Sequence, residues 1–213
     1  VDYFALVFGI AKVGAVSVPI NPRFKARELK HVISNSDMTA LVASDNLLEM
    51  PDPLDMLEEA LPSLASAMEP ELHLAEAPLL RHIVIDGDSS RDWASDYVSM
   101  LEGGGSTPDE LVLSRSASVA IRDTAIIMYT SGTTANPKGV MLPHEALVRH
   151  GFTIAETRFE LTEDDRVWSA LPLHHIGGMA FFFTCLAAGA TYCHTANFDP
   201  GRSIEQLQDE GCT

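Results

Sequence analysis

A loop rich in hydroxyl groups and glycine follows a short apolar run near the middle of the chain. Residues 129–140 read YTSGTTANPKGV and hold four Ser or Thr hydroxyls, two glycines and one lysine. Hydroxyls and backbone N–H groups, which glycine allows to approach closely, can wrap around phosphate oxygens, and the ammonium group of Lys138 adds a positive charge. Pro137 stiffens the turn before that lysine. The loop therefore predicts binding of phosphate.

The composition of the loop also fits two other interpretations. Ser, Thr, Gly, Asn and Pro are all turn formers, so a hydroxyl-rich stretch can be a plain surface turn. A Walker-type loop would have its second glycine five residues after Gly132 and a Ser or Thr after the lysine, whereas this chain has Pro137 and Gly139 there. This spacing disfavours a P-loop kinase or GTPase.

The second group of candidate residues is the segment PLHHIGGM, residues 172–179. Side chains of adjacent residues on a strand or loop point to opposite sides, so His174 and His175 make a poor pair of metal ligands. No carboxylate lies nearby at the spacing of a ligand. We therefore predict no metal site here, and a buried histidine is the plain interpretation of the pair.

The other histidines and the cysteines suggest no further site. His144 follows the loop at a helix start and is assigned to capping or packing. Histidines that stand alone on helical or strand patterns are interpreted as surface or core residues, and these are His31, His73, His82, His150 and His194. Three scattered cysteines without a C-x-x-C pair argue against a disulfide framework or a zinc site and favour a reducing compartment, with the cytoplasm as the default.

The charge of the chain bears on its partners. Thirty acidic and 14 basic residues give a formal net charge of −16, which repels nucleic acid and anionic membrane surfaces. The most apolar stretch, residues 177–190, is shorter than the roughly 20 residues that span a bilayer, so it predicts a buried helix. We expect neither a nucleic-acid partner nor a membrane span.

The elements around both candidate segments alternate between helix and strand, which predicts an α/β fold. Helical patterns cover 3–14 and 28–33. Two more begin near His144 and after Gly177, and a last one near the end of the chain stops before Gly211. Strand patterns cover 16–18, 39–43, 81–85, 125–129, 139–142, 167–171 and 191–194. The acidic residues 46–76 predict short amphipathic surface helices broken at prolines, and 102–108 (EGGGSTP) predict a flexible linker or loop.

The loop closely resembles the phosphate-loop signature of the adenylate-forming (AMP-binding) superfamily, which includes acyl-CoA synthetases, luciferases and the adenylation domains of peptide synthetases. Residues 4–45 and 171–191 are similar to the family as well, and the resemblance is weakest between 46 and 120. It implies the layered sheet-and-helix subdomains of the family's large N-terminal domain. Residues 1–213 would form part of that domain, incomplete at both ends and without the small C-terminal domain.

The resemblance also implies roles for individual residues. His175 would lie along the acyl pocket as a catalytic residue that faces the substrate carboxylate and the α-phosphate, while Gly177 and Gly178 would let substrate pass close to the backbone. Ala135 stands where the family usually has glycine, so a positive φ there would cost roughly 1 kcal/mol or more. The β- and γ-phosphates of ATP would be enclosed by Thr130, Ser131, Gly132, Thr133, Thr134 and Lys138.

The implied reaction joins a fatty or aryl carboxylic acid to CoA through an acyl-adenylate, with ATP and, in the complete enzyme, Mg²⁺. The family places its adenine and Mg²⁺ contacts, a ribose-binding aspartate and a catalytic lysine downstream of Thr213, so we expect this chain alone to be inactive. A truncated nucleotide-binding homologue without catalysis is one alternative, which Ala135 favours. An adenylation module of a peptide synthetase, or a luciferase-like enzyme, is another, and it differs in the acceptor of the acyl group.

Overall fold

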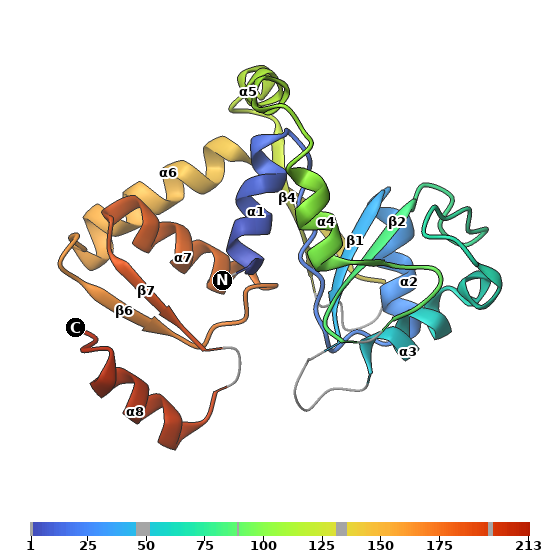
Figure 1. The fold of residues 1–213 in the computed structure, drawn as a ribbon. Helices are drawn as coiled ribbons and strands as arrows, with labels where there is room; N and C mark the ends of the chain where they lie inside the picture. The colour runs from blue at the N-terminus through green and yellow to red at the C-terminus, as the bar shows by residue number, and fades with distance from the viewer. Residues whose placement is uncertain (1, 46–51, 89, 131–135, 196–197) are drawn as a thin grey trace. The chain divides into compact units, whose positions relative to one another are not determined.

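The computed structural model describes residues 2–45, 52–88, 90–130, 136–195 and 198–213. These residues form helices and small sheets in two compact units (Figure 1). The first unit comprises Val1–Pro19, Val119–Met128 and Met141–Thr213, and the second comprises Ile20–Ser118 and Tyr129–Val140. The predicted α/β fold is confirmed.

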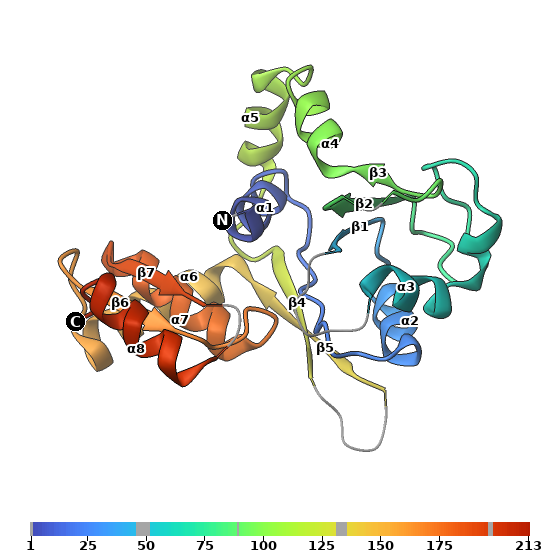
Figure 2. The ribbon, with the colours of Figure 1, turned by 60° about the horizontal axis from the view of Figure 1, so that its bottom comes forward.

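The second unit is built on a parallel sheet with the strand order β1-β2-β3. Its strands are β1 (Ala40–Ser44), β2 (His82–Asp86) and β3 (Ser95–Asp96). Ala40 lies opposite His82 in this sheet. The helices of the unit are α2 (Ala26–Asn35), α3 (Pro53–Ala60), the 3-10 helix η1 (Pro62–Ser66), α4 (Tyr97–Gly104) and α5 (Asp109–Ser118). Figure 2 shows α2 and α3 together next to β1.

Helix α2 forms because its sequence is amphipathic and its first turn is capped. The Glu28 carboxylate accepts a 3.0 Å hydrogen bond from the Lys25 N–H group, which would otherwise lack a partner at the helix start. Leu29, Val32 and Ile33 are buried on one side of the helix. Burying each such side chain contributes about 1.5–3 kcal/mol, so this side of α2 is firmly anchored in the core of the unit.

The predicted linker at 102–108 is wrong in its first half. Helix α4 continues through Glu102, Gly103 and Gly104, and the Gly105 N–H group donates to the Glu102 carbonyl at 3.1 Å. The helix starts firmly because the Asp96 carboxylate accepts a 2.7 Å bond from the Ser99 N–H group. The cap at Asp96 and the burial of Tyr97 anchor the start of the helix, which continues despite the low helix propensity of the glycines.

The first unit contains a parallel pair of strands, β6 (Arg166–Ser169) and β7 (Thr191–His194), joined through helix α7 (Ile176–Ala188). Helix α7 ends at Gly189, whose φ of 74° suits glycine. The other helices are α1 (Asp2–Lys12), α6 (His144–Ile154), the π-helix η2 (Ala155–Phe159) and α8 (Pro200–Asp209). Within the described residues, no helix is long and apolar enough to cross a membrane.

Strands β4 (Thr124–Thr130) and β5 (Lys138–Pro143) pair with each other and flank the candidate loop. The predicted strand at 16–18 is reduced to one parallel bridge between Ser17 and Ile126 of β4. Two bonds of 2.9 Å form it, from the Ser17 N–H to the Ala125 carbonyl and from the Ile127 N–H to the Ser17 carbonyl. The segment after α1 is thus tied to β4 within the first unit.

Candidate phosphate-binding site

Strand β4 ends at Thr130 and β5 begins at Lys138, so the two strands form the arms of the candidate loop. The Thr130 hydroxyl lies 3.5 Å from the Lys138 carbonyl oxygen, in position to donate to it. Both residues are exposed, and the Lys138 ammonium group forms no ion pair with any carboxylate in the described ranges. Its positive charge is therefore available to an anion. The described residues do not include the remaining predicted phosphate ligands, which are Ser131, Gly132, Thr133 and Thr134. They also do not include Ala135, which stands where the family usually has glycine.

The residue before each of these two arm residues is held by helix α2. The Tyr129 hydroxyl donates to the Asn35 side-chain oxygen at 2.8 Å, and burial, with the nearby Asp37 charge, raises the pKa of Tyr129. The tyrosine is thus kept as a neutral donor. His31 Nε2 lies 2.9 Å from the carbonyl oxygen of Pro137. Because a carbonyl only accepts, Nε2 carries a hydrogen in this contact, which the interpretation of His31 as an isolated histidine did not foresee.

His175 occupies the N-cap position of α7 in the first unit. Its Nδ1 accepts a 3.1 Å hydrogen bond from the Gly177 N–H group, satisfying one of the unpaired donors at the helix start. Since Nδ1 accepts this bond, the neutral ring carries its hydrogen on Nε2. The side chain is exposed, so an Nε2–H group can donate to an oxyanion.

Gly177 and Gly178 differ in what surrounds them, although the family resemblance implies the same role for both. A Cβ atom on Gly178 would lie 2.3 Å from the Pro172 carbonyl oxygen and 2.7 Å from that of Leu171. A Cβ atom on Gly177 would meet His175 Nδ1 at 3.2 Å. Glycine at 178 is thus required by the protein's own backbone, whatever contact substrate makes there.

The segment before His175 is also tied to helix α1. The Tyr3 hydroxyl lies 3.3 Å from the Leu173 carbonyl and donates to it, and burial raises the pKa of Tyr3 to about 12. Tyr3 therefore stays protonated as a hydrogen-bond donor. This contact fixes the backbone two residues before the candidate catalytic histidine.

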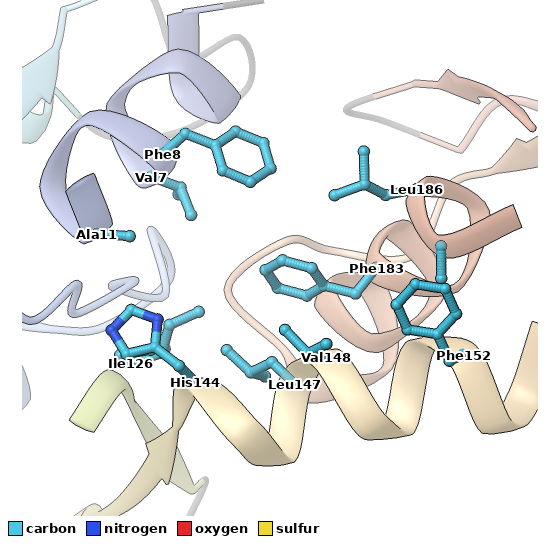
Figure 3. Close-up of a pocket in the computed structure, with 12 residues that line it drawn as sticks. Val7, Phe8, Ala11, Ile126, His144, Leu147, Val148, Phe152, Phe183 and Leu186 are labelled. Carbon is cyan, nitrogen blue, oxygen red and sulfur yellow. The ribbon is translucent and has the colours of Figure 1, made fainter. Parts of the chain in front are cut away.

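A separate apolar pocket of about 260 Å³ lies in the first unit and contains none of the predicted site residues. Figure 3 shows Val7 and Phe8 of α1 on one side and Phe183 and Leu186 of α7 on the other. His144 also lines the pocket, and its Nε2 is buried without a partner among the described residues. The N-cap of α6 is Pro143, so the ring serves packing and does not cap the helix.

The described residues place the candidate site residues in two groups. Thr130 and Lys138 belong to the second unit, whereas His175, Gly177 and Gly178 belong to the first. Among the described residues, no group of three or more His, Cys, Asp or Glu side chains could hold a metal ion. The donors at hand are a hydroxyl, an ammonium group and an imidazole, which suit anionic oxygens.

Comparison with known proteins identifies relatives across the whole chain. The family model described as AMP-binding enzyme matches residues 1–213. YngI of Bacillus subtilis (strain 168) is 31% identical over 216 residues, which cover 100% of this chain and 38% of that protein. The acyl-CoA ligase SID4 of Ajellomyces capsulatus is 29% identical over 214 residues, covering 100% and 34%. The crotonobetaine/carnitine–CoA ligase of Proteus mirabilis (strain HI4320) is 30% identical over 175 residues, covering 82% and 30%. The chain thus spans 30 to 38% of the length of these relatives.

Solved structures share the fold. The chain is similar to the anthranilate CoA ligase AuaEII in complex with anthranoyl-AMP, with a TM-score of 0.76 and 21% identity over 98% of this chain and 36% of that one. It is also similar to the long-chain-fatty-acid-CoA ligase FadD1 of Archaeoglobus fulgidus, with a TM-score of 0.67 and 23% identity, covering 100% and 36%. The predicted layered fold of the adenylate-forming enzymes is therefore confirmed.

Proposed function

The chain belongs to the AMP-binding enzyme family, and we propose that it forms the phosphate-binding part of an ATP-dependent carboxylate–CoA ligase. The observation that carries this proposal is the pair of loop arms, where Thr130 meets Lys138 and the lysine ammonium group has no carboxylate partner among the described residues. The relatives named as CoA ligases support the reaction class.

In the proposed reaction, a carboxylate oxygen of a fatty or aryl acid attacks the α-phosphorus of ATP. The bond from that phosphorus to the bridging oxygen breaks, and pyrophosphate leaves. The thiol of CoA then attacks the acyl carbon of the adenylate, loses its proton, and releases AMP. Two anions must approach each other in the first step, so groups that neutralise charge dominate its energetics.

The residues of this chain would supply part of that neutralisation. We assign Lys138 as the charge partner of the β- and γ-phosphates, and the hydroxyls and N–H groups of residues 130–134 as their hydrogen-bond donors. We assign His175 Nε2–H as a donor to the carboxylate or α-phosphate, because its Nδ1 is engaged with Gly177. Mg²⁺ would neutralise further phosphate charge in the complete reaction. No described residues cluster as ligands for it, so none is assigned.

A nucleotide-binding homologue without catalysis is the second candidate. Ala135 favours it, because a side chain at a position that usually holds glycine would disturb a loop that must turn closely around phosphate. On the ligase proposal, Ala135→Gly leaves ATP affinity unchanged or improves it. A clear loss of affinity in a calorimetric titration would show that the loop does not turn in this way.

The proposed function is tested by binding and by exchange. Calorimetry with ATP on this chain should give saturable binding that Lys138→Ala weakens. The complete natural protein should catalyse exchange of labelled pyrophosphate into ATP only when a fatty or aryl acid is added, and His175→Ala should reduce that exchange. Binding of ATP without exchange for any acid in the panel would favour the non-catalytic homologue, and absence of both would reject the two candidates together.

A further inference from the structure

Helix α2 contacts both arms of the candidate loop with residues spaced four apart. The Asn35 side-chain oxygen accepts from the Tyr129 hydroxyl at 2.8 Å, and His31 Nε2 lies 2.9 Å from the Pro137 carbonyl. The Arg27 guanidinium group reaches the Asn136 side-chain oxygen at 3.4 Å. Positions 27, 31 and 35 fall on one side of a helix because four residues make slightly more than one turn.

This polar side of α2 lies opposite the side that is buried in the core. Ala26, Leu29, Val32 and Ile33 bury the opposite side in the second unit. The helix is therefore anchored by its core contacts. All the residues involved, including Tyr129 and Pro137, belong to the same unit.

His31 is placed to have the largest effect on the loop. The carbonyl that it holds belongs to the peptide group linking Pro137 to Lys138, so the bond fixes the plane from which the lysine backbone continues. Pro137 is buried and the contact is partly shielded from water, which strengthens the bond relative to an exposed one. The His31 ring also packs against the Tyr129 ring in a perpendicular arrangement, with ring centroids 6.4 Å apart and the planes at 89°.

We propose that α2 is a positioning element for the phosphate-binding loop, in which the Nε2–H group of His31 sets the backbone of the lysine arm. This inference rests on the proposed function of the loop. His31 acts on the loop through the Pro137 carbonyl and is not assigned as a ligand of the phosphate. Without the bond, the arm that carries Lys138 would sample more conformations, and phosphate binding would have to restrict them at a cost in affinity.

Three variants separate this role from ordinary packing. His31→Phe keeps a ring of similar size beside Tyr129 but removes the donor. His31→Gln places a donor N–H group at a similar distance from the backbone and should restore the bond. Ser34→Ala is the matched control on the same helix, since the hydrogen bonds of the Ser34 hydroxyl within the described part of the chain go to the carbonyls of Lys30 and His31 in α2.

Two measurements on the 213-residue chain test whether His31 positions the lysine arm. The affinity for inorganic tripolyphosphate, by calorimetry, should fall about fivefold in His31→Phe and stay within about twofold of wild type in the other two variants, since one such bond accounts for about that factor. Amide hydrogen exchange at Lys138 and Gly139 should rise by a similar factor in His31→Phe alone. Exchange in β2 should be unchanged in all three.

Unchanged affinity and unchanged exchange in His31→Phe would overturn the inference, as would His31→Gln behaving like His31→Phe. If the wild-type chain does not bind tripolyphosphate, the proposed function fails, and exchange at Lys138 and Gly139 still decides whether His31 positions the arm. If His31→Phe also raises exchange in β2, the histidine stabilises the unit as a whole, and the positioning role is rejected.

Discussion

Replacement of Gly178 by alanine should destabilise the first unit far more than the same change at Gly177. A Cβ at position 178 would lie 2.3 Å from the Pro172 carbonyl oxygen, well inside the 3.0 Å that Cβ atoms keep from other heavy atoms. The obstacle is backbone, so relief requires α7 or the segment before it to move. We expect a loss of about 3 kcal/mol in the free energy of unfolding, the upper end for overpacked positions.

Gly177→Ala is the matched control one residue away. Its Cβ would come closest to His175 Nδ1, at 3.2 Å, and that side chain is exposed and can shift, while the Leu171 side chain lies at an ordinary contact distance of 3.9 Å. Alanine is also the better helix former by about 1 kcal/mol, so stability should stay within about 1 kcal/mol of wild type.

Urea unfolding followed by NMR measures both variants, because the indole N–H signals of Trp168 and Trp93 report the first and second unit separately. Only Gly178→Ala should move the Trp168 transition to lower urea. Equal midpoints for the two variants and wild type would refute the close approach of Pro172 to α7.

Three further predictions concern charge and burial. Lys138→Ala should weaken ATP binding at least about tenfold, as for the loss of a charged hydrogen-bond donor, whereas Lys12→Ala, which removes the same charge from α1, should not change calorimetric affinity. Burial lowers the pKa of His194 below its usual 6.5, so the unfolded chain takes up a proton at a higher pH than the folded chain. The first unit should therefore lose stability as the pH falls below about 6.5, and His194→Gln should flatten that dependence in urea titrations. Burial raises the pKa of the Cys185 thiol to about 11, so iodoacetamide at pH 8 should modify half-exposed Cys212 first and Cys185 last by mass spectrometry, and equal rates would contradict the burial.

The strands and helices nearest the candidate sites were predictable because their signals are local. The run at 191–194 forms β7 with those bounds, and the apolar stretch after Gly177 forms α7. A period of hydrophobic residues and a terminal glycine are enough to define such elements. The runs at 125–129 and 139–142 likewise form β4 and β5, each of which extends one residue further at both ends.

What the sequence did not indicate depends on contacts between distant residues. The bond from His31 to Pro137 joins positions 106 apart, and nothing around a single histidine on a helix indicates its partner. The separate requirement for Gly178 arises from the carbonyls of Leu171 and Pro172, which reach it only once the chain has turned into α7. At 102–104 the glycines suggested a loop, but the cap at Asp96 starts a helix that continues through them.

The most direct test of the phosphate-binding loop is an NMR titration of the ¹⁵N-labelled chain with ATP, tripolyphosphate and AMP. The proposed function predicts saturable shifts of the Thr130 and Lys138 amide signals with ATP and with tripolyphosphate, and much weaker shifts with AMP, which lacks the β- and γ-phosphates. Equal responses to AMP and ATP, or shifts confined to residues away from these two arms, would contradict the proposed function.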